Sequence, residues 1–314
     1  MSFKKQFLKN KNNKLLYYAQ ALCRELVPKA WYRRKRDKIL RKNWDDQSAY
    51  ITRRVNYYNR LEQHTTLSPE AITIREYRIP KKIRVYYFDS MEYLRYFNPQ
   101  LKFELIPGDV VHVPASPAFV KSRPLQNDNR NSVLLKLNKI RHFNFLHDDI
   151  PLSAKKDLLV GRSGFKQPHR QRFFEQYHDH PLCDLKKVKS SKHPDFLTIT
   201  QHLEYKFILA LEGYDVATNL KWIMSSNSIA VMPKPRYETW FMEGTLLPDH
   251  HYICIADDYS DLAEKLNYYI NHPEAAAAIV KNAHLYIEQF KDAEREEAIS
   301  LLVMQKYFEK TNAR

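Results

Sequence analysis

Only five glycines occur in the 314 residues of this chain, where average usage of about 7% would give roughly 22. No two of them have the spacing of a G-x-G-x-x-G dinucleotide loop or of a G-x-x-x-x-G-K-[ST] phosphate loop. The scarcity also excludes collagen-like, glycine-linker and blade-repeat architectures. We expect each remaining glycine to lie where the backbone requires one. The five are Gly108, Gly161, Gly164, Gly213 and Gly244.

The length and composition are typical of a folded protein of about two domains. Hydrophobic residues make up 44% of the chain and aromatic residues 13%, which argues against disorder. The longest uninterrupted apolar run, at 275–280, is far shorter than the ~20 residues of a membrane-spanning helix. Three widely spaced cysteines without a C-x-x-C pair indicate thiols in a reducing compartment. The composition therefore predicts a cytoplasmic protein.

The net charge of +15 is concentrated near the N-terminus. The first 60 residues contain 17 Lys and Arg against 4 Asp and Glu, whereas the rest of the chain holds 34 and 32. Within this segment, leucine and alanine recur at helical spacing, and Trp31 and Tyr32 precede four consecutive basic residues. The recurring positions are Leu15, Ala19, Leu22 and Leu26.

A basic amphipathic segment of this kind fits an anionic surface, namely inner-leaflet lipid, phosphorylated glycolipid or nucleic acid. We expect a membrane surface, because no nucleic-acid-binding motif accompanies the charge. The alternative is a solvated helix that packs on the core through its leucine stripe.

From about residue 70 the chain changes to short apolar runs separated by prolines. The runs 83–88 and 103–106 are typical of strands, and Pro107 and Gly108 end the second one. Apolar residues at helical spacing predict a helix over 131–143.

After residue 151, strand and helix patterns alternate, which predicts an α/β fold with a parallel sheet covered by helices on both faces. Strands are predicted at 158–160, 207–211, 228–232 and 252–255, and helices at 168–177, 216–225, 260–270, 273–290 and 294–308. The expected organisation is a basic helical segment, a first α/β domain, a second α/β domain and a C-terminal helix. Their ranges are 1–65, 66–150, 151–290 and 291–314.

Two strand-to-helix turns of the second domain have the features of a phosphate site. Ligands of open α/β sheets lie beyond the carboxyl ends of the strands, often at helix N-termini. Glycine allows the backbone to approach a diphosphate closely, and arginine makes bidentate contacts with phosphate. The first turn contains Gly161, Arg162, Ser163 and Gly164; the second contains Glu212, Gly213, Tyr214 and Asp215, followed by Asn219 and Lys221. Each turn alone is also an ordinary connection, so the ligand-binding interpretation depends on their occurring together.

Several motifs follow one another in order along residues 83–290. They are 120–124 (VKSRP), 131–135 (NSVLL), 139–143 (KIRHF), 204–206 (EYK), 211–222 (LEGYDVATNLKW), 226–228 (SNS), 237–244 (YETWFMEG), 251–252 (HY) and 261–262 (DL). As a set they resemble glycosyltransferase family 90, which includes lipopolysaccharide core glycosyltransferases and protein O-glucosyltransferases. The upstream motifs resemble the bacterial lipopolysaccharide branch. The resemblance implies two facing Rossmann-like domains with a cleft between them (the GT-B fold) and an inverting, metal-independent transfer from a UDP-sugar.

The sequence also favours a reaction that does not depend on a metal ion. There is no D-x-D motif, which metal-dependent sugar transferases use to hold a divalent cation on the diphosphate. The run His178, Asp179 and His180 precedes Pro181 and is interpreted as a polar loop.

An inverting transfer needs a base that deprotonates the acceptor hydroxyl and positive charge or amide dipoles that stabilise the leaving UDP. The resemblance places the base at Asp109, after an early strand of the first domain, where a carboxylate would face the cleft. Asp128 and Asp148 are the competing bases, and a turn or helix-capping role is the structural alternative for Asp109.

For the donor, the resemblance implies Arg162, Ser163 and Gly164, together with the turn at 213–219. Asn219 stands where the protein O-glucosyltransferases have an arginine, so either Lys221, or Lys121 and Arg123 across the cleft, is expected to replace the lost cation. Further candidates are Lys121 and Arg123 on the acceptor side of the cleft, and Glu238, which is either a ligand of donor hydroxyls or a structural residue.

The sequence thus predicts a cytoplasmic enzyme, peripherally bound to the inner membrane, that moves glucose or galactose from UDP to a heptose of the lipopolysaccharide or lipooligosaccharide core. UDP-glucose or UDP-galactose is the donor, and no further cofactor is expected. Transfer to a capsular or other surface glycan is one alternative. A non-catalytic adaptor that binds nucleic acid or lipid is another.

Overall fold

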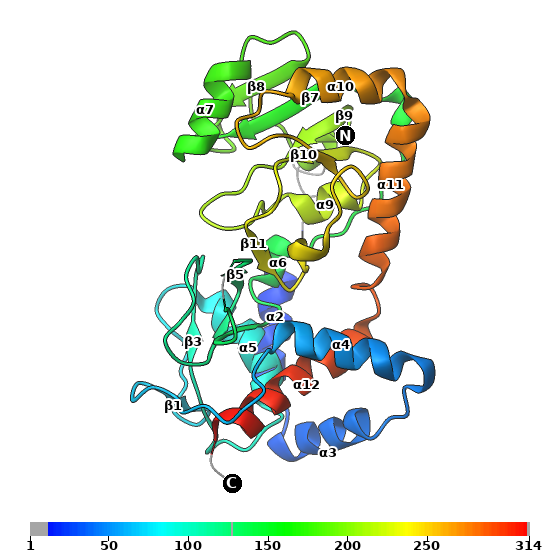
Figure 1. The fold of residues 1–314 in the computed structure, drawn as a ribbon. Helices are drawn as coiled ribbons and strands as arrows, with labels where there is room; N and C mark the ends of the chain where they lie inside the picture. Colours follow the sequence, from blue (N-terminus) through cyan, green and yellow to red (C-terminus); the bar gives the residue numbers. More distant parts are fainter. Residues whose placement is uncertain (1–11, 127, 313–314) are drawn as a thin grey trace. The chain divides into compact units, whose positions relative to one another are not determined.

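The computed structural model describes residues 12–126 and 128–312, which belong to two compact units (Figure 1). We call residues 12–13, 140–235 and 244–289 the sheet unit, and residues 14–139, 236–243 and 290–312 the helical unit. This division differs from the predicted domain ranges. The boundary lies at residue 139, and both the C-terminal helix and the segment 236–243 belong to the helical unit.

The sheet unit is built on a five-stranded sheet in which all neighbouring strands are parallel. The strand order is β12-β10-β9-β7-β8. The strands are β7 (Lys156–Ser163), β8 (Cys183–Lys187), β9 (Tyr205–Leu209), β10 (Ile229–Met232) and β12 (Ile253–Cys254). Every residue of the central strand β9 is buried, as expected for a parallel strand covered on both faces. The predicted α/β class with a parallel sheet is therefore confirmed.

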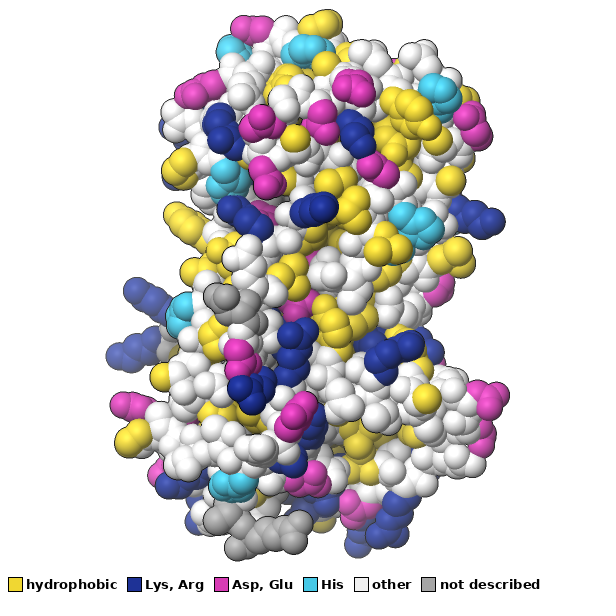
Figure 2. Space-filling view, in the orientation of Figure 1, with side chains coloured by type: hydrophobic (Ala, Val, Ile, Leu, Met, Phe, Trp, Pro, Cys, Tyr) yellow, Lys and Arg dark blue, Asp and Glu magenta, His cyan; other side chains and the backbone are white. Residues whose placement is uncertain are grey.

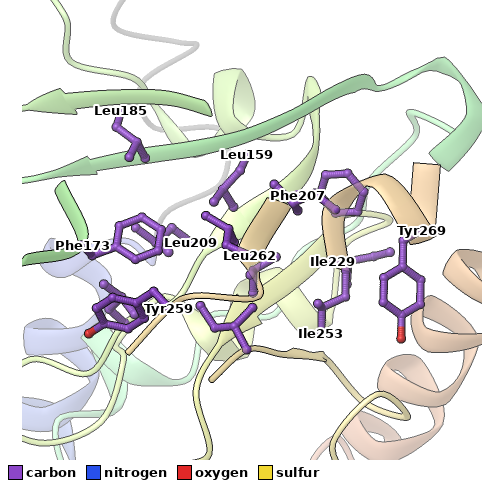
Figure 3. Packing of buried hydrophobic residues seen from close by; sticks show 14 of the residues in the cluster. Leu159, Phe173, Leu185, Phe207, Leu209, Ile229, Ile253, Tyr259, Leu262 and Tyr269 are labelled. Atoms are coloured by element: carbon purple, nitrogen blue, oxygen red, sulfur yellow. The ribbon is translucent and has the colours of Figure 1, made fainter. Parts of the chain in front are cut away.

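The helices of this unit are α6 (Lys139–His142), α7 (Pro168–Tyr177), α8 (Ile199–His202), α9 (Leu220–Met224), α10 (Leu262–Asn271) and α11 (Pro273–Glu288), with 3-10 turns at Leu152–Ala154 and Glu243–Thr245. Helices α7, α10 and α11 begin within two residues of their predicted starts, whereas α8 was not predicted. Proline occupies the first turn of α7 and α11, where its missing N–H costs no hydrogen bond. The predicted helix 216–225 is shortened to α9. Side chains from α7 and α10 pack on the strands in one apolar core that includes Leu159, Phe173, Phe207, Ile229 and Leu262 (Figure 3).

Gly161 lies inside β7, where a side chain would not fit. A Cβ atom at this position would lie 2.7 Å from Cδ2 of Leu185 and 3.2 Å from Cδ2 of Leu209. Both leucines belong to the buried core of the sheet. Gly161 is therefore required by packing and not by the approach of a ligand.

The helical unit combines five longer helices with short strands. The helices are α2 (Lys14–Glu25), α3 (Lys29–Leu40), α4 (Ser48–Tyr58), α5 (Arg84–Leu94) and α12 (Ala293–Thr311), with a 3-10 turn at Asp45–Gln47. A parallel sheet of order β3-β4-β6 is formed by β3 (Leu105–Ile106), β4 (Ala118–Val120) and β6 (Ser132–Leu134). Two antiparallel pairs join β1 (Ile72–Thr73) to β2 (Lys102–Phe103) and β5 (Ser122–Pro124) to β11 (Tyr237–Thr239).

Two predictions for this unit are wrong. The apolar run 83–88 has the composition of a strand but lies in α5, because its consecutive aromatic residues are buried among helices. The predicted helix over 131–143 is instead the buried strand β6 followed by the short helix α6. The apolar spacing of this segment fits either a helix or a strand. Pairing of Ser132–Leu134 with β4 makes it a strand.

A buried ionic network holds the segment 236–243 in the helical unit. The indole Nε1 of Trp240 donates to Glu296 at 2.8 Å. The same carboxylate accepts hydrogen bonds from Arg54 at 2.7 Å and from Lys136 at 3.0 Å. The Trp240 ring stacks on Tyr58 with ring centres 3.8 Å apart. Since Glu296 is on α12, these contacts explain why both late segments join the N-terminal part of the chain.

Candidate functional site

The carboxyl ends of β7 and β9 define the edge of the sheet at which a ligand is expected. These strands are parallel neighbours, so the turns that follow Ser163 and Leu209 emerge at the same edge. Helix α7 begins shortly after β7, at Pro168. The free amides of its first turn and the two turns therefore belong to one region of the sheet unit.

Arg170, in the first turn of α7, joins the two predicted turns. Its guanidinium donates to the carbonyl oxygens of Leu211 at 2.6 Å and of Glu212 at 2.7 Å. A third nitrogen lies 3.4 Å from Oγ of Ser163. A Cβ atom added to Gly213 would lie 3.6 Å from the same guanidinium. The structure thus brings together Ser163, Glu212 and Gly213 around an arginine that the sequence interpretation missed.

A second cation lies near this arginine. Burial lowers the pKa of the Arg170 guanidinium, and the positive charge of Arg141 lowers it further, while the carboxylate of Glu212 acts in the opposite direction. Two guanidinium groups that repel one another are stabilised by an anion between or beside them. A diphosphate supplies that charge, and its oxygens match the planar donors of arginine.

Arg162 does not face this site. Its guanidinium makes two bonds of 2.8 Å to the carboxylate of Asp184, and it also donates to three backbone carbonyls. Burial works to raise the pKa of Asp184, but the hydrogen bonds from Arg162 and Tyr205 hold it below its usual value. Arg162 and Ser163 are consecutive residues of β7, so their side chains point to opposite faces of the sheet. The geometry assigns Arg162 to a structural ion pair between β7 and β8.

The other predicted donor residues divide into exposed and buried ones. Tyr214 is 73% exposed in the turn after β9, and the amide of Gly213 bonds to the carbonyl of Asp215 at 2.9 Å. Asn219 donates to the carbonyl of Leu209 at 2.9 Å and so ties the start of α9 to the end of β9. Asp215 and Lys221 are buried, so the cation expected to replace the lost arginine lies inside the unit. Gly164 is in the turn between β7 and α7, next to Lys166.

In the helical unit, Asp109 follows β3 and lies at the end of a parallel strand. The preceding Gly108 has a φ of 103°, a conformation that favours glycine and turns the chain sharply. The carboxylate of Asp109 is 40% exposed and accepts a hydrogen bond from the buried ammonium of Lys121 at 2.5 Å. The next amide, that of Val110, donates to Ser122 at 3.1 Å. Asp109 is therefore a positioned carboxylate that remains open to solvent.

The two competing bases have different surroundings. Asp128 is exposed in a loop, and its hydrogen bonds from Arg130 hold its pKa below its usual value, which weakens it as a base. Asp148 belongs to the sheet unit, where its side chain is 1% exposed and pairs with Lys155 at 2.8 Å. Asp109 is the one of the three that is both positioned and accessible.

Arg123 and Glu238 form a buried pair. They face one another across the antiparallel strands β5 and β11, with Nε and Oε1 2.8 Å apart and both side chains 0% exposed. Tyr57 also donates to Glu238, and the Arg123 guanidinium donates to backbone carbonyls. The pair joins β5 to β11 within the helical unit, which is the structural role left open for Glu238; contacts of the two residues with acceptor and donor stay predictions.

The residues interpreted as a polar loop lie at the end of α7. His178 bonds to the carbonyl of Phe174 and lies 2.9 Å from Asp179, and both side chains are exposed. Among the described residues, no group of three or more His, Cys, Asp and Glu side chains is placed to hold a metal ion. Nor does the described part of the chain contain a helix long and apolar enough to cross a membrane.

Comparison with known proteins identifies the class. Residues 154–310 match the family model described as Glycosyl transferase family 90. The chain therefore belongs to glycosyltransferase family 90, and the resemblance predicted from its motifs is confirmed. Among individual proteins, it is 42% identical over 304 residues to the O-glucosyltransferase LpsA of Dichelobacter nodosus, a match that covers 94% of this chain and 95% of that protein.

Proposed function

We propose that this protein is an inverting, metal-independent glycosyltransferase that moves a hexose from a UDP-sugar to a heptose of the lipopolysaccharide or lipooligosaccharide core. The observation that carries the donor assignment is the convergence of two strand-end turns on Arg170, with Arg141 nearby, in a family 90 chain. The similarity to an O-glucosyltransferase over almost its whole length favours glucose over galactose as the hexose.

In this proposal the sheet unit binds the UDP-sugar. Arg170 and Arg141 neutralise the diphosphate, while the hydroxyl of Ser163 and the backbone of the Gly213 turn contact its oxygens. Positive charge fixed at this position stabilises the negative charge that develops on the leaving UDP. Because Arg170 is held by two carbonyl oxygens before the donor arrives, little reorganisation is needed during the reaction.

The helical unit binds the acceptor and supplies the base. We assign Asp109 to deprotonate the attacking hydroxyl, with Lys121 as the residue that positions the carboxylate. The two units would then be the two facing domains of a GT-B enzyme, and one base acting with one displacement gives inversion at the anomeric carbon.

The acceptor is built at a membrane surface, so the basic N-terminal segment has a place in this function. The phosphates and acidic sugars of an inner core attract Lys and Arg, as do the anionic lipids of the cytoplasmic leaflet. We propose that the enzyme is peripherally attached there and needs no cofactor besides the UDP-sugar.

A donor screen tests the proposal. The protein is mixed with UDP-glucose or UDP-galactose and with a truncated core oligosaccharide, and mass spectrometry looks for the increment of one hexose. NMR of the product gives the anomeric configuration, and a chelator is added to test metal independence. UDP binding without any increment would favour a non-catalytic adaptor, and an increment on a capsular glycan alone would replace the acceptor.

Substitution of the base tests the mechanism. Asp109→Asn should abolish transfer while UDP binding persists, because the amide cannot accept the hydroxyl proton. Asp128→Asn is the matched control, since it removes an exposed carboxylate from the same unit and should leave transfer unchanged. Turnover near the wild-type value in Asp109→Asn would eliminate the assignment.

A further inference from the structure

Helix α2 exposes apolar side chains that its packing does not use. It contacts α5 through Tyr17, Tyr18 and Ala21, and not through the leucines that recur at helical spacing. Leu15 and Leu22 are 81% and 54% exposed, and Leu26, the first residue after α2, is 84% exposed. At about 100° per residue the two helical leucines project within an arc of about 20°, and the centre of this arc lies about 100° from the centre of the face that carries Tyr17, Tyr18 and Ala21. The sequence alternative in which the stripe packs on the core is therefore wrong.

Helix α3, the next helix along the chain, exposes positive charge. Its buried face carries Tyr32 and Ile39. The outward face begins with Trp31, which is 50% exposed, and continues with the exposed cations Arg34, Lys38 and Arg41. Figure 2 shows Lys and Arg side chains gathered at the end of the helical unit where Figure 1 draws α3.

A groove of about 780 Å³ lies between α3 and the start of α12. Trp31 and Ile39 contribute apolar surface to its lining, and cations and two carboxylates line the rest. Its charged lining residues are Arg34, Lys35, Lys38, Arg41, Lys42, Glu294 and Glu297.

The carboxylates of the groove are already neutralised. Glu297 pairs with Lys35 at 2.5 Å, and Glu294 pairs with Lys42 at 2.7 Å. Within the described residues, no ion pair joins Arg34, Lys38 or Arg41 to a carboxylate. The groove therefore presents three uncompensated positive charges beside apolar surface.

This combination defines the chemistry of the occupant. Exposed leucines on one helix, a tryptophan where the two helices adjoin and unpaired cations on the next are the features of a segment that lies in the interface of an anionic bilayer. The cations complement lipid phosphates, and the leucines are removed from water among the acyl chains. A soluble anion would use the charges but would leave the leucine stripe in water.

We propose that α2 and α3 form a membrane-binding surface, in which the leucine stripe enters an anionic bilayer and the α3 groove takes a lipid phosphate headgroup. The inference rests on the membrane part of the proposed function and names the side chains that carry it. It is independent of which sugar is transferred.

Vesicle co-sedimentation of the full chain tests the surface. Vesicles of phosphatidylglycerol with phosphatidylcholine should bind the protein at low salt, and vesicles of phosphatidylcholine alone should bind it far less. Replacing Arg34, Lys38 and Arg41 together by Gln should weaken binding on the order of 100-fold, at about one kcal/mol for each charge near the surface. High salt should weaken the wild type more than this variant.

A second variant isolates the leucines. Replacing Leu15, Leu22 and Leu26 together by Ser should weaken binding at least about tenfold and should leave its salt dependence in place.

A matched control for the variant that loses three cations replaces three exposed lysines elsewhere on the protein by Gln and should bind vesicles like the wild type. These lysines are Lys81, Lys189 and Lys192. Since all the altered side chains are exposed, thermal unfolding should be unchanged, which separates lost binding from lost folding.

The outcomes separate this inference from the proposed function. Wild-type vesicle binding by both triple variants would overturn it, even if transfer to a soluble truncated core is intact. A leucine variant that changes the oligomeric state and not vesicle binding would also overturn it and would assign the stripe to a second copy of the chain. Binding that falls as expected in a protein without any transferase activity would support the surface and refute the proposed function.

Discussion

The competing base Asp148 is expected to be a structural residue, and its substitution by Asn should destabilise the protein. Its carboxylate is 2.8 Å from the ammonium of Lys155, and the two side chains are 1% and 0% exposed. It also accepts hydrogen bonds from the amides of Ile150 at 3.1 Å and of Asn227 at 2.9 Å. Asn removes the charge and turns one acceptor into a donor. Lys155 would then be a buried cation whose remaining partner is the carbonyl of Leu203.

The magnitude follows from that burial. Removing one partner of a buried ion pair costs about 3–5 kcal/mol, because the other charge is left uncompensated. The lower end applies here, since the Leu203 carbonyl still accepts from Lys155 and burial already lowers the pKa of this lysine. A loss of about 3 kcal/mol changes the folding equilibrium on the order of 100-fold. With a urea slope of about 3 kcal/mol/M, the midpoint should fall by about 1 M.

Urea unfolding followed by far-UV circular dichroism measures the change. The double substitution Asp148→Asn with Lys155→Met is the control and should recover most of the lost stability, because it leaves no buried charge. An unchanged midpoint in Asp148→Asn would refute the reasoning. Loss of transfer at wild-type stability would instead make Asp148 the base.

Three further predictions concern the sheet unit. Gly161→Ala should lower the free energy of unfolding by about 1–3 kcal/mol, since the new methyl group meets Leu185, while calorimetry should find the UDP affinity of the folded variant unchanged. Arg170→Ala should weaken UDP binding at least tenfold, whereas Arg162→Ala should lower the melting temperature instead; the reverse pattern would return the donor role to Arg162. Burial lowers the pKa of His202 in the folded protein to about 4 from 6.5. As the pH falls, the imidazole is therefore protonated in the unfolded chain before it is protonated in the folded protein. The stability contribution of neutral His202 is thus present above pH 6.5 and is lost between 6.5 and 4, and His202→Gln should show a shallower loss in acid unfolding.

The alternation of strands and helices after residue 151 could be predicted because local and tertiary signals agree there. The strands are buried on both faces, so their apolar residues are consecutive, and prolines mark the first turns of α7 and α11. In the helical unit these signals conflict. The aromatic run at 83–88 has a strand-like composition, yet it is buried as a helix, and only tertiary packing distinguishes the two.

The candidate site shows the same limit at the level of single residues. The turns at Ser163 and Gly213 could be predicted, because glycine and hydroxyl residues at strand ends have a local meaning. The direction of Arg162 could not be predicted without knowing that β7 continues to Ser163, since alternation along a strand sends these two side chains to opposite faces. The sequence did contain a signal for Arg170 as a donor-site residue. Pro168 marks the start of a helix just beyond a strand, and Arg170 lies in the first turn of that helix, where phosphate ligands bind.

Glycine scarcity proved to be a weak guide to the site, and the turn between β7 and α7 shows why. The positive φ in that turn belongs to Phe165 at 44° and not to the adjacent Gly164. A left-handed conformation costs an L-residue about 1–2 kcal/mol. Phe165 is 3% exposed and packs on Phe174 with ring centres 4.9 Å apart, and burying a phenylalanine stabilises by about 1.5–3 kcal/mol. Glycine would relieve the backbone strain but would lose the stabilisation from the buried ring, which is of similar or larger size. A chain with few glycines can therefore make a sharp turn with a buried aromatic residue, and such a turn is invisible to a search for glycines.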